Sequence, residues 1–441
     1  MRKRSRFAWL LGSGLVLVAI FLSARLSRDD MGSDADFDRI VAPLRPKPIE
    51  TVEPSQNAYL LVDDPAFYIP GNELAGRKPV TAHLLQRPQT LEALILAEQT
   101  ANLPYYQDLK QETQGMDNNA SHAMVGLARL LAARARVRFS TGDWQEGLAD
   151  IRRVEHLGVI HGDRGFIEHW RMGNEMLEMG EQALQAAFRA DQIPAQMARQ
   201  ITRKPVLDRR SVYIEIIRRY LQREVIKTLR SGNQVGPGGP APGFFSPGLY
   251  AGNPEDYGRY DRMETVQRIA QMVDTAVKEL LAPTKQVPSP LTQMLDAADM
   301  AIPLRPRYAP GTPLQATLPA NIAWRARIRM MPNGRGMAFV SYLYVLEFDN
   351  EKISERFRIA SQRATRILAA LSAFRQEQGR EANSLTELVT RGFMRAYPLD
   401  PYDGLPLRYS ASRGAIWSVA NDVTDQGGDA FKDFLWSTKS P

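Results

Sequence analysis

The chain contains no cysteine. This absence excludes structural disulfides, thiolate metal sites, a cysteine nucleophile and a lipid anchor attached to cysteine. It also makes the protein indifferent to the redox state of its compartment.

The motifs of common catalytic and nucleotide-binding sites are missing as well. The sequence has no Walker loop, no Rossmann glycine fingerprint, no G-x-S-x-G and no H-E-x-x-H. Three histidines, His156, His161 and His169, lie close together beside Glu168. His156 and His161 are five residues apart, which is off the i,i+4 spacing of a helical metal pair, so we interpret the three as surface or boundary residues. The sequence predicts no catalytic residue and no organic cofactor.

The N-terminus combines a basic segment with a long uncharged run. Residues 1–6 carry four cations, and residues 7–24 (FAWLLGSGLVLVAIFLSA) carry no charge. Eighteen residues span about 27 Å as a helix, close to the ~30 Å hydrocarbon core of a bilayer. The preceding cations favour a cytoplasmic N-terminus. Because Leu22 is bulky for a cleavage site, we favour an uncleaved single-pass anchor in a bacterial inner membrane, with a cleaved signal peptide as the alternative.

The predicted extracytoplasmic location changes what the net charge of +7 implies. Outside the cytoplasm a basic body meets anionic lipid or wall polymers rather than nucleic acid. A basic stripe on one predicted helix is a candidate for such contacts, and its alternative is an ordinary solvated face; its residues are Arg219, Arg223, Lys227 and Arg230.

The 441 residues suffice for two or three domains. Apolar periodicity and Gly/Pro content predict a mainly α protein with a small C-terminal α+β module. We expect a basic tail and transmembrane helix at 1–28, a linker at 29–57 and an all-helical domain at 58–230. An irregular Gly/Pro-rich region with short helices at 231–335 follows, and then a long helix with the α+β module at 336–436.

One helical hairpin has a more specific pattern. Residues 121–160 contain two apolar-periodic segments separated by the breaker STGD. Gly142, Trp144, Gly147 and Ile151 lie where a tetratricopeptide repeat places its turn glycine, aromatic, small and apolar residues. The hairpin therefore resembles one such repeat, within a larger helical domain.

The C-terminal segment has an ordered series of signals. A long helix ends at Gly379, Ser384 and Glu387 predict a capping box, and a short helix closes at Gly392. The stretch YPLDPYDGLPLRYS, residues 397–410, is rich in turn formers, and the alternating runs on either side of residues 412–414 predict an antiparallel hairpin.

This segment resembles the C-terminal domain of type II secretion major pseudopilins. The family turn is matched by Pro398, Asp400, Pro401, Tyr402, Gly404, Pro406 and Tyr409, with Asp403 inserted, and the family loop by Ser418, Asp422, Gly427, Gly428 and Asp429. The N-terminal apolar run lacks the glutamate of pseudopilins, so we do not expect the chain to polymerise into a pseudopilus. The whole chain also resembles uncharacterised membrane-anchored bacterial envelope proteins.

The pseudopilin resemblance implies a calcium loop. Ser418, Asp422, Asp425 and Asp429 could supply side-chain oxygens to Ca²⁺, which takes six to eight oxygen ligands. The alternative is that these aspartates cap turns through local backbone hydrogen bonds.

Two functions follow as expectations. The first is a non-enzymatic envelope protein, related to secretion or envelope assembly, that acts by protein–protein contact. The second is an envelope hydrolase or wall-polymer binder whose carboxylates meet only in three dimensions, such as Glu168 with Asp163.

Overall fold

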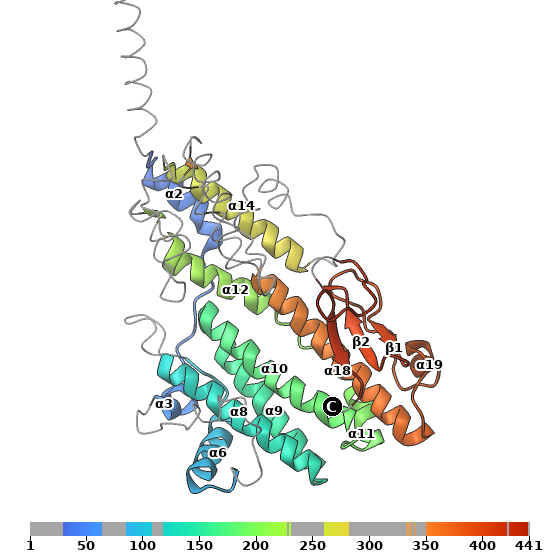
Figure 1. Cartoon of the computed structure of the whole chain (residues 1–441). Helices are drawn as coiled ribbons and strands as arrows, with labels where there is room; N and C mark the ends of the chain where they lie inside the picture. Colours follow the sequence, from blue (N-terminus) through green and yellow to red (C-terminus); the bar gives the residue numbers. More distant parts are fainter. Residues whose placement is uncertain are drawn as a thin grey trace, which may run out of the picture. The chain divides into compact units, whose positions relative to one another are not determined.

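The computed structural model describes residues 30–63, 85–107, 118–226, 229–230, 260–281, 333–334, 336, 340, 350–420 and 423–439. These residues are mainly helical, with a small antiparallel sheet near the C-terminus, as the sequence predicts (Figure 1). None of the helices in this part of the chain is both long and apolar enough to cross a membrane, and the predicted anchor, residues 7–24, lies outside it.

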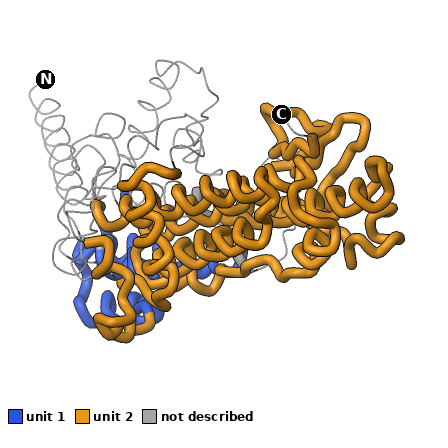
Figure 2. Tube along the Cα trace, turned by 90° about the horizontal axis from the view of Figure 1, so that it is seen from below, with its two compact units in different colours: residues 1–46, 218–282, 287–352 blue, residues 47–217, 283–286, 353–441 orange. Residues whose placement is uncertain are grey.

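The described chain forms two compact units, coloured separately in Figure 2. The first, unit 1, comprises Met1–Pro46, Arg218–Ala282 and Val287–Lys352. The second, unit 2, comprises Lys47–Ile217, Pro283–Gln286 and Ile353–Pro441. Each unit is therefore assembled from segments that are distant in sequence.

Unit 1 contains helix α2 (Asp34–Val41), the 3₁₀ turn η1 (Ala42–Leu44), the π-helical segment η3 (Leu221–Ile226) and helix α14 (Arg262–Leu281). Helix α2 lies within residues 29–57, where the sequence leads us to expect a linker. The Ser33 side chain caps it, and its buried Phe37 lies under two guanidinium groups, those of Arg230 (5.3 Å) and Arg262 (5.0 Å). Arg230, from the predicted basic stripe, is paired with Asp38.

Unit 2 is built around three long helices in sequence. They are α8 (Asn118–Ser140), α9 (Trp144–Asp163) and α10 (Ile167–Arg189). The first two form the predicted hairpin, and the buried Asp150 of α9 ties them together by accepting hydrogen bonds from Arg134 and Arg138 of α8. Helices α9 and α10 touch at glycines, because a Cβ on Gly173 would lie 2.5 Å from the Gly158 carbonyl oxygen.

The shorter elements of unit 2 surround these helices. They are η2 (Pro54–Gln56), α3 (Tyr59–Val62), α6 (Pro88–Ala101), α11 (Ala195–Ile201), α12 (Arg210–Tyr220, which continues into unit 1) and α19 (Leu385–Thr390). Tyr59, Val62 and the buried face of α6 join one core with α8 and α9.

A second core joins the C-terminal module to the helices. The long helix α18 (Asn350–Gln378) contributes Ile367, Leu371 and Phe374, which share this core with α10 and α11. The sheet has the order β1 (Arg408–Ser410), β2 (Ala415–Ser418), β3 (Phe434–Ser437), all antiparallel. Phe357 of α18 packs 4.8 Å from Phe434, ring centre to ring centre, so the sheet lies against α18.

Candidate functional site

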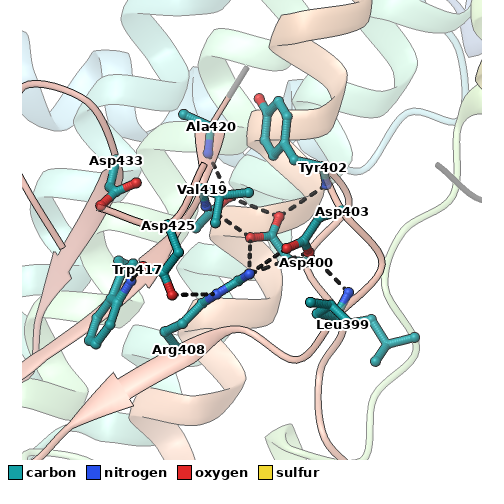
Figure 3. A network of polar contacts seen from close by, with 12 residues as sticks. Leu399, Asp400, Tyr402, Asp403, Arg408, Trp417, Val419, Ala420, Asp425 and Asp433 are labelled. Atoms are coloured by element: carbon teal, nitrogen blue, oxygen red, sulfur yellow. Dashed lines mark hydrogen bonds and ion pairs between the residues drawn. The ribbon is translucent and has the colours of Figure 1, made fainter. Parts of the chain in front are cut away.

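The proline-rich turn of the C-terminal module is organised by one buried carboxylate, that of Asp400 (Figure 3). Its Oδ1 accepts from the Tyr402 backbone N–H at 3.0 Å and the Ser418 hydroxyl at 2.9 Å. Its Oδ2 accepts from the Val419 backbone N–H at 3.0 Å and the Arg408 guanidinium at 2.9 Å. Asp400 thus fixes its own turn and joins it to the ends of β1 and β2.

Burial and hydrogen bonding act in opposite directions on this carboxyl. Burial, the larger influence, raises the pKa of Asp400, while the donors of Tyr402, Val419 and Ser418 oppose that rise. Arg408 also pairs with Asp403, the inserted residue of the motif. Of the residues in this network, Asp400, Tyr402 and Ser418 belong to the pattern that resembles pseudopilins, whereas Arg408 and Val419 do not.

The predicted calcium ligands that the structure describes make hydrogen bonds within the protein. Ser418 donates to Asp400. Asp425 accepts from the Trp417 indole N–H and the Gly427 backbone N–H, each at 2.9 Å, and the Trp417 bond is the main cause of its lowered pKa. Asp429 accepts from the Phe431 backbone N–H at 2.9 Å.

The bonds from the backbone N–H groups of Gly427 and Phe431 are of the local kind that the turn-capping alternative expects. Asp422, the fourth predicted ligand, lies outside the described residues. Across the chain segments that the structure describes, no group of three or more histidine, aspartate or glutamate side chains is placed to hold a metal ion. Calcium binding through Asp422 and its neighbours remains a prediction.

Large apolar side chains are exposed on the C-terminal module. Phe431 is 99% exposed, Leu405 58% and Leu399 48%. They stand on hydrogen-bonded turns, because the Asp400 N–H donates to the Leu405 carbonyl at 2.6 Å and Asp429 caps the Phe431 N–H. Tyr397 and Leu435 are exposed on the same module. We call these five residues the module apolar set.

A carboxyl pair that the sequence did not reveal lies where α9, α10 and α18 meet. Burial, the largest influence, raises the pKa of Glu181 to about 7; the nearby Glu155 raises it further, while Thr365 and Arg366 oppose the rise. The pKa of Glu155 is also raised, mainly by burial, and Lys204, Arg152 and Arg366 act against that rise. A carboxyl that titrates near neutral pH can both donate and accept a proton there.

The sequence suggested a different pair of carboxylates, Asp163 and Glu168. Asp163 is paired with Arg209. Glu155 and Glu181 are 26 residues apart and come together only because helices α9 and α10 pack antiparallel. No local spacing signals such a pair.

The interpretation of the histidines as surface or boundary residues was wrong for two of the three. His161 and His169 are fully buried, and His156 is half-buried. His161 follows Val154 and Leu157 by seven and four residues, so it continues the buried stripe of α9. This helical spacing in the sequence could have indicated that His161 is buried.

Comparison of this sequence and structure with protein family models, curated proteins and solved structures finds no match.

Proposed function

We propose that the chain is a single-pass protein of the bacterial inner membrane, anchored by residues 7–24, whose extracytoplasmic body acts by protein–protein contact through the C-terminal module. The observation that carries this proposal is the module apolar set. Phe431, Leu405 and Leu399 face water on turns fixed by internal hydrogen bonds. Exposed aromatic and aliphatic side chains on rigid supports are typical of the centres of protein interfaces.

The resemblance to pseudopilins also supports a function through protein–protein contact, because proteins of that family act by assembling with one another. The buried Asp400 and its donors build a turn whose outer residues remain available for contact. A role in secretion or envelope assembly is the class of function that this arrangement suits best.

Site-specific photo-crosslinking in native membranes tests this function. A photoreactive amino acid replaces Phe431 or Leu405 in turn, and the matched control replaces Thr141, an exposed residue of the α8–α9 turn. We expect a discrete protein adduct from positions 431 and 405 and none from 141. Absence of an adduct at both module positions, or equal adducts at all three, would refute contact through the module.

The anchor is tested separately on the full chain. We expect the protein to stay in the membrane fraction during alkaline extraction, and its body to be cut by protease added from the extracytoplasmic side only. Release into the soluble fraction would contradict the anchor. The crosslinking result would still stand, because it tests contact through the module and does not depend on the anchor.

The carboxyl pair favours a second candidate function, hydrolysis of an envelope polymer. Its specific support is the pKa of Glu181, about 7, next to a second carboxyl. Purified wall polymer incubated with the chain should release soluble fragments, and Glu181→Gln should abolish the release. Glu178→Gln, on the same helix, is the control. No release by the unaltered chain would exclude this candidate.

A further inference from the structure

One end of the helix bundle in unit 2 contains a buried imidazole, that of His161. Helices α8, α9 and α10 run antiparallel in succession, so the start of α8, the end of α9 and the start of α10 meet at this end. The His161 ring is packed 4.4 Å from the Tyr106 ring and 5.1 Å from the His169 ring, between centroids. Its relative exposure is zero.

Neither ring nitrogen of His161 has a hydrogen-bond partner among the described residues. A buried polar atom without a partner costs about 1–3 kcal/mol, so this arrangement calls for an explanation. A metal shared with His169 is a poor one. The Nδ1 of His169 accepts from the Phe166 backbone N–H at 3.2 Å, which places the proton of the neutral ring on Nε2, the nitrogen a metal would need.

The charged neighbours of His161 disfavour its protonation. Arg209, in the segment before α12, lies 4.3 Å over the Trp170 ring, and its positive charge faces the site. Asp163, on the same helix as His161, is already bound to Arg209. His169 of α10 is the other titratable base, while Tyr106 is neutral and His122 of α8 is exposed. Burial first, then His169 and Arg209, hold the pKa of His161 well below 6.5.

Two short segments cover this end of the bundle. We call residues 50–59 and 103–107 the cap. The Ala58 N–H donates to the Tyr105 carbonyl at 2.8 Å, and the Asn57 side chain bonds both the N–H and the carbonyl of Gln107 at 2.9 Å. Tyr106 is inserted from the cap against His161 and is itself buried.

Hydrogen bonds to backbone carbonyls join the cap to α9 and to the residue that follows it. Arg164 donates to the Glu50 carbonyl and stacks on Tyr105, and the His156 Nε2–H donates to the Leu103 carbonyl at 2.9 Å. Because that carbonyl only accepts, the His156 bond persists whether or not its ring is charged. By contrast, α9 and α10 are in backbone contact through glycines, and separating them would open the core.

We propose that His161 makes the cap an acid-sensitive latch: when its imidazole gains a proton, the cap opens at Tyr106 and admits water to the ring. A charged imidazole in the closed site would have no acceptor and would face Arg209. Moving Tyr106, whose ring packs against His161, would let water reach the imidazole. Acidification would thereby expose Tyr59 and Tyr106 without unfolding the helices.

The size of the effect follows from proton linkage. A hydrated histidine titrates near 6.5, while the closed ring stays neutral, so opening is coupled to the uptake of one proton. Lowering the pH from 7.5 to 5.0 should then increase the open fraction about 30-fold.

Hydrogen–deuterium exchange of the full-length chain at pH 7.5 and 5.0 tests the latch, after correction for intrinsic exchange rates. We expect amides of the cap to lose about 30-fold of their protection at pH 5.0, while amides of α18 keep theirs. His161→Leu and, as a second replacement, His161→Gln should abolish the acid response of the cap. His122→Gln, an exposed histidine at the same end, should keep it.

Three results would overturn the proposal. The first is equal cap protection in the unaltered chain at both pH values, which needs no variant. The second is an equal loss of protection in α18, which would mean general unfolding. The third is an undiminished acid response in either folded His161 variant.

Discussion

Replacing Glu181 with glutamine should stabilise the protein, and should do so only above acidic pH. The carboxyl is partly buried where α9, α10 and α18 meet, and its pKa is raised from 4.5 to about 7. One pKa unit corresponds to about 1.4 kcal/mol, so ionised Glu181 is about 3 kcal/mol less favourable in the folded chain than in the unfolded chain. Relaxation of the surroundings reduces the cost of burying a charge, so we expect about 1–3 kcal/mol.

The sign of the pH dependence follows from proton binding. Between pH 4.5 and 7 the folded chain keeps a proton on Glu181 that the unfolded chain has lost. The unaltered protein therefore loses stability from this residue as pH rises through that window and reaches its full penalty above pH 7. Glutamine cannot ionise, so the advantage of Glu181→Gln should be small at pH 5 and largest at pH 8.

Thermal unfolding at pH 5, 6, 7 and 8 measures this difference. A gain of about 2 kcal/mol corresponds to a rise in Tm of roughly 4–8 °C for a unit of this size. Glu178→Gln on the same helix, whose carboxylate bonds Gln182 at an exposed position, is the control and should change Tm equally at all four values. A Glu181→Gln protein no more stable than the unaltered chain at pH 8 would refute the reasoning.

Three further predictions concern packing and buried charge, and each can be measured by denaturant unfolding. Gly173→Ala should destabilise unit 2 by about 2–3 kcal/mol, because its Cβ would lie 2.5 Å from a backbone oxygen of α9; Gly180→Ala, whose nearest neighbour is a side chain at 3.4 Å, should cost little. Asp400→Ala should cost about 2–4 kcal/mol, since it leaves the Ser418 hydroxyl and the backbone N–H groups of Tyr402 and Val419 without their acceptor while Arg408 keeps Asp403; Asp429→Ala should cost under about 1 kcal/mol. Asp150→Ala should cost about 3 kcal/mol by removing the carboxylate that three arginines share, and equal stability of the variant would contradict its role.

The long helices could be predicted from the sequence because their apolar residues recur with helical spacing. Helix α18 ends where Gly379 predicts, and the α8–α9 hairpin turns at Gly142. Helix α6 begins at Pro88, a residue favoured in the first turn of a helix. The Glu387 carboxylate accepts from the Asn383 N–H, one residue before the position a capping box predicts.

Short elements were harder to predict. Helix α2 has only eight residues, three of which are acids, although Ser33 with Asp36 and the buried pair Phe37 and Val41 are its local signals. Strand β3 has four residues, and its alternation of Phe434 and Trp436 with exposed residues is brief. Such short elements are stabilised mainly by packing against other parts of the folded chain. The periodicity of their own sequence carries no information about that packing.

The buried sites illustrate the same limit. Asp400 stands in a turn motif that the sequence shows, but only two of its four donors, Tyr402 and Arg408, lie within eight residues of it. Glu181 owes its pKa to burial among three helices. His161 owes its environment to Tyr106, which is 55 residues away in the chain. Tertiary packing creates both environments, so no short window of sequence reports them.

Unit 2 consists of segments that are separated in the sequence by parts of unit 1, and this affects how the protein folds during synthesis. Its second core combines residues 135–201 with residues 360–436, so the helices that leave the ribosome first lack part of their core until nearly the whole chain has been synthesised. During that interval their unfilled apolar faces are exposed. Because contacts this distant in sequence form slowly, the emerging chain would depend on a holding chaperone more than its helical content suggests.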